Sequence, residues 1–183
     1  MSSEKRCGWL ARGVKLGLLA SLCFSLAVGL YGCGFKLRGD QRFAFNTLYS
    51  GFAATSEMGA QFRRNVRLAE STTITSEEAT AQARLVILGE GRLPKETLSI
   101  STTGRPREYL LRSRLSFKLL GTVSEGPEKE LIPTSEIILR RTVTASDQDF
   151  GAKQLEEELL YREMLNDLVD QLMRRLAAAK RSP

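Results

Sequence analysis

The first strong pattern in the chain is an apolar run from Leu16 to Tyr31, which follows a segment with four basic side chains. A membrane-spanning helix needs about 20 apolar residues, whereas the apolar region of a secretory signal has about 7–15. The length of the run therefore favours a signal peptide. The run leads into Gly32-Cys33, and a cysteine at this place is typical of a lipoprotein cleavage box, in which the cysteine becomes the lipid-bearing N-terminus.

This pattern predicts how the chain is divided. Residues 1–32 are expected to be a lipoprotein signal peptide, and residues 33–183 are expected to form the mature protein, with 33–45 as a tether behind the lipid on Cys33. The alternative is an uncleaved signal anchor with Cys33 as a bystander. Tyr31 keeps this alternative open, because a small residue is usual at that position.

Composition narrows the class of protein. All three cysteines lie in the first 33 residues, so the predicted mature domain has no disulfide. The chain has no histidine, which excludes Ser-His-Asp and Cys-His catalysis and histidine-ligated metal sites. No catalytic residue, metal site or cofactor is predicted. Half of the net charge of +6 belongs to residues 1–32, so binding to nucleic acid is not expected either.

The segment after the tether predicts a first helix flanked by strands. Ser56 is a typical N-cap residue, and apolar side chains follow it at helical spacing through Glu70. Residues 46–49 and 71–75 are strand-like, the second because it is rich in β-branched side chains. Thr75-Ser76-Glu77-Glu78 predicts a capping box that opens a short helical turn.

Alternation of apolar and polar residues predicts longer strands in the middle of the chain. The clearest strand covers residues 108–120, in which Leu111, Leu115 and Phe117 share one face and Arg112 and Arg114 share the other. The other predicted strands are 84–88, which suits a central position, 97–101, which resumes after an interruption at Pro94, and 136–144, with turns at 102–106 and 125–128.

A long amphipathic helix is predicted from about Asp149 to Ala179. Tyr161, Leu165, Leu168, Leu172 and Leu176 recur at steps of three or four residues and form its core-facing stripe. Acidic residues lie early in this helix and basic residues late, which complements the helix dipole. The order of elements predicts an α+β fold with a single domain, in which two helices pack on one face of a mostly antiparallel sheet of about four strands.

Several segments carry a resemblance to a known family. Cys33-Gly34-Phe35-Lys36-Leu37-Arg38-Gly39 resembles the start of the mature lipopolysaccharide-assembly lipoproteins of the LptE (RlpB) family. The later similarities are Glu108-Tyr109 at the start of a long strand, Ile132-Pro133 before the next strand, and Arg162-Glu163-Met164 with Gln171 to Leu176 in the last helix.

The resemblance implies a location and partners. Members of that family are outer-membrane lipoproteins on the periplasmic side, which plug the β-barrel protein LptD and bind lipopolysaccharide without catalysing covalent chemistry. The family's proposed lipopolysaccharide contacts lie near a turn and a helix entry, which here makes Arg105, Arg107 and Lys153 candidates. Thr102 stands where a basic residue is expected, so that Arg105 or Arg107 would have to substitute.

A second set of candidates lies on one strand. Arg112, Arg114 and Lys118 form a basic row that is suited to hold the phosphates of lipopolysaccharide through charge-assisted bonds. The alternative is a solvated face, or one paired with glutamates of a neighbouring strand. Two rival functions also stay open, namely a general outer-membrane scaffold or binding lipoprotein unconnected with lipopolysaccharide, and an enzyme acting on envelope polymers through paired carboxylates.

Overall fold

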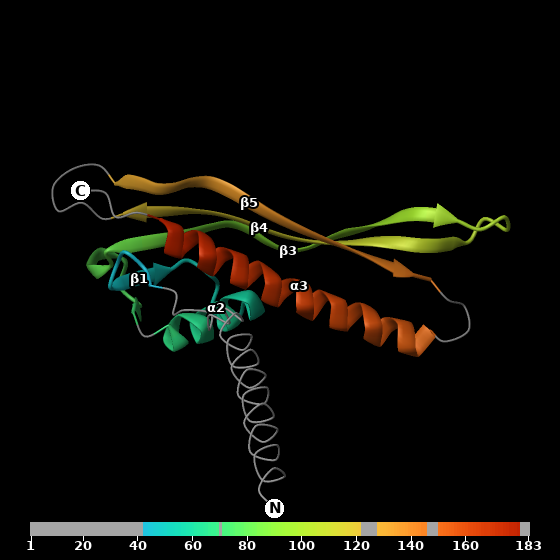
Figure 1. The fold of residues 1–183 in the computed structure, drawn as a ribbon, viewed down its shortest axis with the longest axis horizontal. Helices are drawn as coiled ribbons and strands as arrows, with labels where there is room; N and C mark the ends of the chain where they lie inside the picture. The colour runs from blue at the N-terminus through green and yellow to red at the C-terminus, as the bar shows by residue number, and fades with distance from the viewer. Residues whose placement is uncertain (1–41, 70, 122–127, 146–149, 180–183) are drawn as a thin grey trace, which may run out of the picture. The chain divides into compact units, whose positions relative to one another are not determined.

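Two helices lie against the same face of a five-stranded sheet in the computed structural model (Figure 1). The structure describes residues 42–69, 71–121, 128–145 and 150–179, which all belong to one compact unit. The predicted signal peptide and Cys33 lie outside the described residues, as does most of the predicted turn at 125–128. The α+β class and the two helices expected from the sequence are confirmed.

The sheet contains one strand more than expected and is mixed, with strand order β2-β1-β3-β4-β5. Its strands are β1 (Thr47–Ser50), β2 (Thr73–Thr75), β3 (Ala83–Ile100), β4 (Pro106–Gly121) and β5 (Lys129–Thr144). The three long strands pair antiparallel, whereas the short β1 pairs in parallel with both of its neighbours. Parallel neighbours need a crossover connection, and the first helix supplies it between β1 and β2.

β3 runs without interruption through Pro94, so the predicted break between two separate strands is wrong. The pairing with β4 shifts register between Leu93 and Glu96, which places Pro94 in an irregularity of the ladder. On its other side, β3 pairs with β1 only over Ala83 to Leu85. Pro94 therefore lies on a sheet edge, where a missing backbone donor is tolerated.

The first helix, α2 (Glu57–Leu68), begins where the sequence predicted it. The Ser56 side chain accepts a hydrogen bond from the backbone N–H of Gly59 at 2.9 Å. The predicted short helical turn is present as a 3-10 turn, η1 (Glu78–Thr80), but the predicted capping box is wrong, because η1 has no side-chain cap. Thr75 Oγ1 instead accepts from the N–H of Glu77 at 3.2 Å, in a local turn that competes with capping.

The alternating faces predicted for β4 and the apolar stripe predicted for α3 (Phe150–Ala178) are confirmed, because the two meet in the main core. Phe62 of α2, Phe117 of β4 and Leu168, Leu172 and Leu176 of α3 are fully buried there. We call this part of the domain the proximal half. It comprises β1, β2 and α2 together with the segments of the long strands and of α3 that pack on them (Figure 1).

The long strands and the start of α3 continue beyond the main core, as the projecting β3–β4 hairpin shows (Figure 1). We call this part the distal half; it comprises β3 from Gly89, β4 up to Ser113, β5 from Leu139 and α3 up to Met164. Its apolar cluster is much smaller and consists of Leu111, Val143, Tyr161 and Met164 with partly buried neighbours. The gap between helix and sheet is therefore incompletely filled by apolar side chains, and cavities lie there.

Candidate ligand-binding site

The basic residues predicted from the sequence fall into three places in the fold. Arg105 and Lys153 line one cavity between the sheet and the start of α3. Arg107 lines a separate recess with Ser99, Glu108, Thr144 and Ala145. The row formed by Arg112, Arg114 and Lys118 lies on the sheet face opposite the helices. The structure thus brings Arg105 and Lys153 together, although 48 positions separate them in the chain.

The cavity that joins them, which we call the distal cavity, has a volume of about 540 Å³. Its lining comes from four elements: Lys95 from β3, Arg105, Pro106 and Tyr109 from the turn and β4, Val143, Thr144 and Ala145 from the end of β5, and Lys153, Gln154, Glu157 and Glu158 from α3. Tyr109 and the buried Val143 give it an apolar floor. Three cations and two carboxylates therefore surround a partly apolar surface.

The hairpin turn presents Arg105 to this cavity. Gly104 has φ of +80°, a conformation that glycine adopts without steric cost, and it closes the turn with an N–H bond to the carbonyl of Ser101 at 2.9 Å. Ser101 Oγ also accepts from the backbone N–H of Arg105 at 3.1 Å. These bonds fix the backbone from which the Arg105 side chain extends. The turn predicted at 102–106 is thereby confirmed in its main features.

Two lysines of the distal cavity are paired with glutamates of α3. Lys95 Nζ lies 2.6 Å from Glu157 Oε2 and 5.7 Å from the centre of the Tyr109 ring. Lys153 Nζ lies 2.7 Å from Glu156 Oε2, one turn along the same helix. The ammonium groups are thus held beside carboxylates at the rim of the apolar floor.

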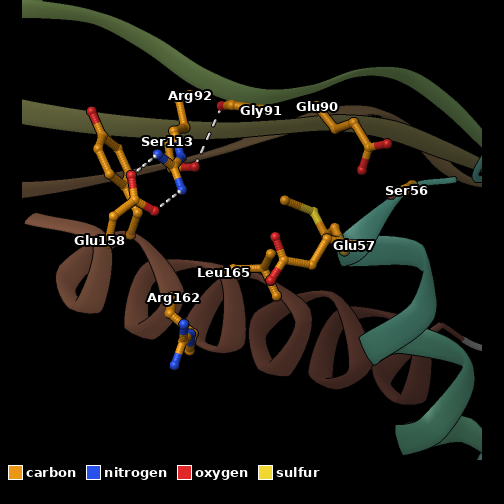
Figure 2. A pocket seen from close by; sticks show the side chains of 11 residues that line it. Ser56, Glu57, Glu90, Gly91, Arg92, Ser113, Glu158, Arg162 and Leu165 are labelled. Atoms are coloured by element: carbon orange, nitrogen blue, oxygen red, sulfur yellow. Dashed lines mark hydrogen bonds and ion pairs between the residues drawn. The ribbon is translucent and has the colours of Figure 1, made fainter. Parts of the chain in front are cut away.

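A second cavity of about 460 Å³ lies next to the distal cavity, between the start of α2, β3 near Gly91 and α3 (Figure 2). Both guanidinium N–H groups of Arg92 donate to Glu158, each at 2.7 Å, and the guanidinium lies 4.1 Å from the centre of the Tyr161 ring. Because Glu158 lines both cavities, this bidentate pair forms the wall between them.

The contacts between Arg92, Glu158 and Tyr161 shift the pKa values of these three side chains. The hydrogen bond from Arg92 holds the pKa of Glu158 below its ordinary value, and the bond to Glu158 raises the pKa of Arg92. Burial raises the pKa of Tyr161. All three shifts favour the states present at neutral pH, with the ion pair charged and the phenol neutral.

On the opposite face of the sheet, two of the three basic residues are paired with carboxylates of neighbouring strands. Arg112 lies 3.5 Å from Glu96 of β3 and also donates to the carbonyl of Pro94 at 3.4 Å. Arg114 lies 3.9 Å from Glu136 of β5. These pairs agree with the alternative prediction for the row, in which glutamates of neighbouring strands balance its charge. The face is therefore mixed in charge and not basic.

Sequence reasoning missed Lys95, Tyr109 and Glu157 as members of the site. The sequence predicts a strand break at Pro94, whereas the irregularity in the ladder at that point turns Lys95 toward the helix. The acidic run Glu156-Glu157-Glu158 also has a purely local explanation, because acidic residues complement the dipole at the start of a helix. The sequence does contain one signal for these contacts: Arg92 and Lys95, which flank Pro94, are opposite in charge to the acidic run of α3 with which they pair.

Two further observations concern metal binding and membrane spans in the described part of the chain. It contains no group of three or more histidine, cysteine, aspartate or glutamate side chains arranged to hold a metal ion. None of its helices combines the length and the apolar character needed to cross a membrane.

Comparison with solved structures finds lipoproteins with a similar fold. Lipoprotein B from Nitrosomonas europaea is 32% identical, with a TM-score of 0.66, and the match covers 79% of this chain and 91% of that one. The rare lipoprotein B from Shewanella oneidensis is 23% identical (TM-score 0.60, covering 73% and 95%), and a minor lipoprotein from Acinetobacter baumannii is 16% identical (TM-score 0.58, covering 77% and 99%). The last two show the fold alone.

A comparison with curated proteins found no significant match. The sequence model of the family described as LptE, lipopolysaccharide-assembly, matches residues 45–176, which include every strand of the sheet and nearly all of α3. The match agrees with the resemblance drawn from short sequence segments and with the structural likeness to lipoprotein B. This chain therefore belongs to the LptE family, whose members take part in lipopolysaccharide assembly at the outer membrane.

Proposed function

We propose that this protein plugs the LptD β-barrel and binds lipopolysaccharide non-covalently at the distal cavity, so that the glycolipid reaches the outer leaflet of the outer membrane. The observation that carries the proposal is the chemistry of that cavity. Lys95, Arg105 and Lys153 surround the apolar floor of Tyr109 and Val143. Lipid A presents phosphates next to acyl chains, so it matches cations next to an apolar surface.

The proposed mechanism is recognition without chemistry on the ligand. The chain has no histidine, and the carboxylate of Glu158 has a lowered pKa and is held in a bidentate ion pair with Arg92. A general acid would need a raised pKa and a place facing the substrate. The distal cavity instead offers three cations beside apolar surface, two of them paired with glutamates, and these contacts hold an anionic lipid while it moves past.

The surface of the domain supports the plug role. A protein inside a barrel meets a largely polar lumen, so its own surface should carry mixed charges that are internally balanced. The sheet face opposite the helices has this character, with Arg112 beside Glu96 and Arg114 beside Glu136. Such a face contacts a polar wall without leaving a large excess of one charge to be neutralised.

We further propose that acyl chains on Cys33 hold the protein to the periplasmic side of the outer membrane. One acyl chain gives only marginal binding, whereas two signals together give stable anchoring. Mass spectrometry of the protein from outer membranes tests this proposal. The expected species starts at Cys33 and carries the lipid mass, and a species that retains residues 1–32 with an unmodified thiol would contradict it.

Charge reversal tests lipopolysaccharide binding at the distal cavity. The double variant Arg105→Glu/Lys153→Glu should weaken binding about tenfold or more, because charge-assisted contacts are replaced by repulsion. The matched control is the double variant Arg140→Glu/Arg174→Glu, which makes the same change in net charge at two exposed arginines that do not line the cavity. Equal loss in the control and in Arg105→Glu/Lys153→Glu, or no loss in either, would contradict the assignment of the site.

Co-purification tests the barrel partner. Gentle detergent extraction of outer membranes should yield this protein in a stable complex with LptD, and the double variant should still enter that complex because its changes lie in the cavity. Isolation as a free monomer would contradict the plug role. A complex with the barrel and no lipopolysaccharide binding would instead favour the general scaffold function.

A further inference from the structure

The acidic residues of the distal cavity occupy places that an anionic ligand would need. The Glu157 carboxylate contacts the Lys95 ammonium at 2.6 Å, and the Glu157 side chain is only 21% exposed. Because Glu157 lines the cavity together with Lys95 and Tyr109, its charge faces the same space as the cations. The cavity that would receive a phosphate therefore already holds a carboxylate.

A phosphate and the Glu157 carboxylate compete for the same ammonium group. Lys95 Nζ lies 5.7 Å from the centre of the Tyr109 ring, so the ammonium has an aromatic neighbour as well as Glu157. An anion that approaches from the cavity side comes within a few ångströms of Glu157, where like charges repel. The ammonium has three N–H donors, so both anions can contact it, but their mutual repulsion favours the arrangement in which Glu157 has moved away.

Displacement of Glu157 costs little in this structure. The Lys95 side chain is 45% exposed, and ion pairs in such surroundings contribute only weakly to stability. The first turns of α3 bury little apolar surface, since Leu155 and Leu159 are exposed by 74% and 53%. A change of side-chain rotamer, or a small movement of these turns, is enough to free the ammonium.

We propose that Glu157 is a built-in counter-ion, which occupies in the ligand-free protein the place beside Lys95 that a phosphate group of the bound lipid takes. This inference rests on the proposed lipopolysaccharide binding and deepens it, because it assigns Lys95 as a ligand contact and Glu157 as its competitor. Lys153 also pairs with a glutamate, Glu156, but that pair lies within α3 and Glu156 does not line the cavity. The cavity thus selects ligands whose negative charge is stronger than that of a carboxylate.

The test measures the affinity of purified variants for three probes: lipid A with its phosphates, the same lipid A after dephosphorylation, and inorganic phosphate at constant ionic strength. Glu157→Gln should bind phosphorylated lipid A about two- to fivefold more tightly than wild type, the factor that corresponds to an exposed ion pair. Its affinity for dephosphorylated lipid A should not change. Lys95→Gln should weaken binding of the phosphorylated form.

Two controls separate a specific exchange from a change in net charge. Glu163→Gln removes the same charge from an exposed position on α3 outside the cavity lining, and it should leave the affinity unchanged. In a Lys95→Gln background, Glu157→Gln should no longer tighten binding, because the competition is for Lys95 itself. A thermal denaturation curve for each variant verifies that the fold is retained.

The outcomes distinguish this inference from the proposed function. If wild type binds lipid A and Glu157→Gln binds equally or more weakly, the counter-ion inference is overturned and the proposed function stands. If wild type binds neither form of lipid A, both are overturned. Tightening for inorganic phosphate as well as lipid A supports the exchange and shows that the phosphate alone suffices, whereas tightening for dephosphorylated lipid A would overturn it.

Discussion

The proximal and distal halves hold the same helix, α3, against the same sheet by different means. In the proximal half, Leu168, Leu172 and Leu176 are fully buried in a large apolar core. In the distal half, a small apolar cluster around Tyr161 and Met164 is supplemented by the ion pairs of Glu158 with Arg92 and of Glu157 with Lys95, which stay partly exposed. Apolar burial is insensitive to salt and requires close packing, whereas exposed ion pairs are weak and leave space around them.

Under the proposed function, this difference places stability and ligand binding in separate parts of one domain. Regions with little buried apolar surface open at low free energy, and binding sites are commonly drawn from them. The distal half can admit a ligand between helix and sheet without disturbing the core that folds the protein.

Phe62→Ala should destabilise the protein by about 3–5 kcal/mol, because Phe62 is fully buried in the proximal core and its ring lies 5.4 Å from that of Phe52. Urea denaturation measures the change in the free energy of unfolding. The distal counterpart, Leu159→Ala, should change it by less than about 0.5 kcal/mol, since Leu159 is 53% exposed. Similar losses in the two variants would contradict the division into halves.

Gly51→Ala tests packing in the proximal half at the level of the backbone. A Cβ on Gly51 would lie 2.5 Å from the carbonyl oxygen of Leu85, which also accepts the N–H bond of Gly51 at 2.9 Å. The strand backbone would have to move, so we expect a loss of about 1–3 kcal/mol by urea denaturation. The control is Gly89→Ala, where the nearest atom would be at 3.7 Å and the effect should be small.

Gly91→Ala tests the distal half, where space is not limiting. A Cβ added to this glycine would have no neighbouring atom within 4 Å, but its φ of +126° is a conformation that side chains disfavour. We expect a loss of about 1–2 kcal/mol that comes from backbone strain alone. A loss as large as that of Phe62→Ala, in the same urea experiment, would mean that the distal half is packed like the core.

Local sequence patterns predicted the helices and strands that have one clearly apolar face and one clearly polar face. The alternation around Leu111 and Phe117 and the stripe from Tyr161 to Leu176 both reappear as buried faces. The errors concern weak local signals that long-range pairing overrides. A proline inside a strand predicts a break, but Pro94 is tolerated because β1 pairs with β3 only up to Leu85 and leaves Pro94 on a sheet edge. No local sequence pattern shows where β1 ends relative to β3.

The candidate site was only partly predictable for the same reason. Arg105 and Lys153 were grouped through the family resemblance, and the fold brings both to one cavity. Lys95 and Tyr109 enter that cavity through strand register, which depends on the irregularity between Leu93 and Glu96. A shift in register changes which face a side chain occupies, so their membership follows from the folded sheet and not from the sequence pattern.

The smallest expected effect concerns the ion pair between Arg92 and Glu158, and it depends on pH. The pKa of Glu158 is lowered in the folded protein by its bond from Arg92. The pair therefore adds stability above the unfolded-state pKa of glutamate, about 4.3, and this contribution is lost as pH falls through the lower folded-state pKa. The difference in the free energy of unfolding between wild type and Glu158→Gln, measured with urea, should be present at neutral pH and vanish in acid.

High salt gives a second test of whether the pair between Arg92 and Glu158 stabilises the protein through charge. Because the pair is exposed, about 1 M NaCl at neutral pH should also shrink the difference between wild type and Glu158→Gln. The effect of Phe62→Ala should survive the same salt, since apolar burial does not rely on charge. A Glu158→Gln effect that persists unchanged in acid and in high salt would show that Glu158 acts through packing, and the distal half would then be held to the sheet in the same way as the proximal half.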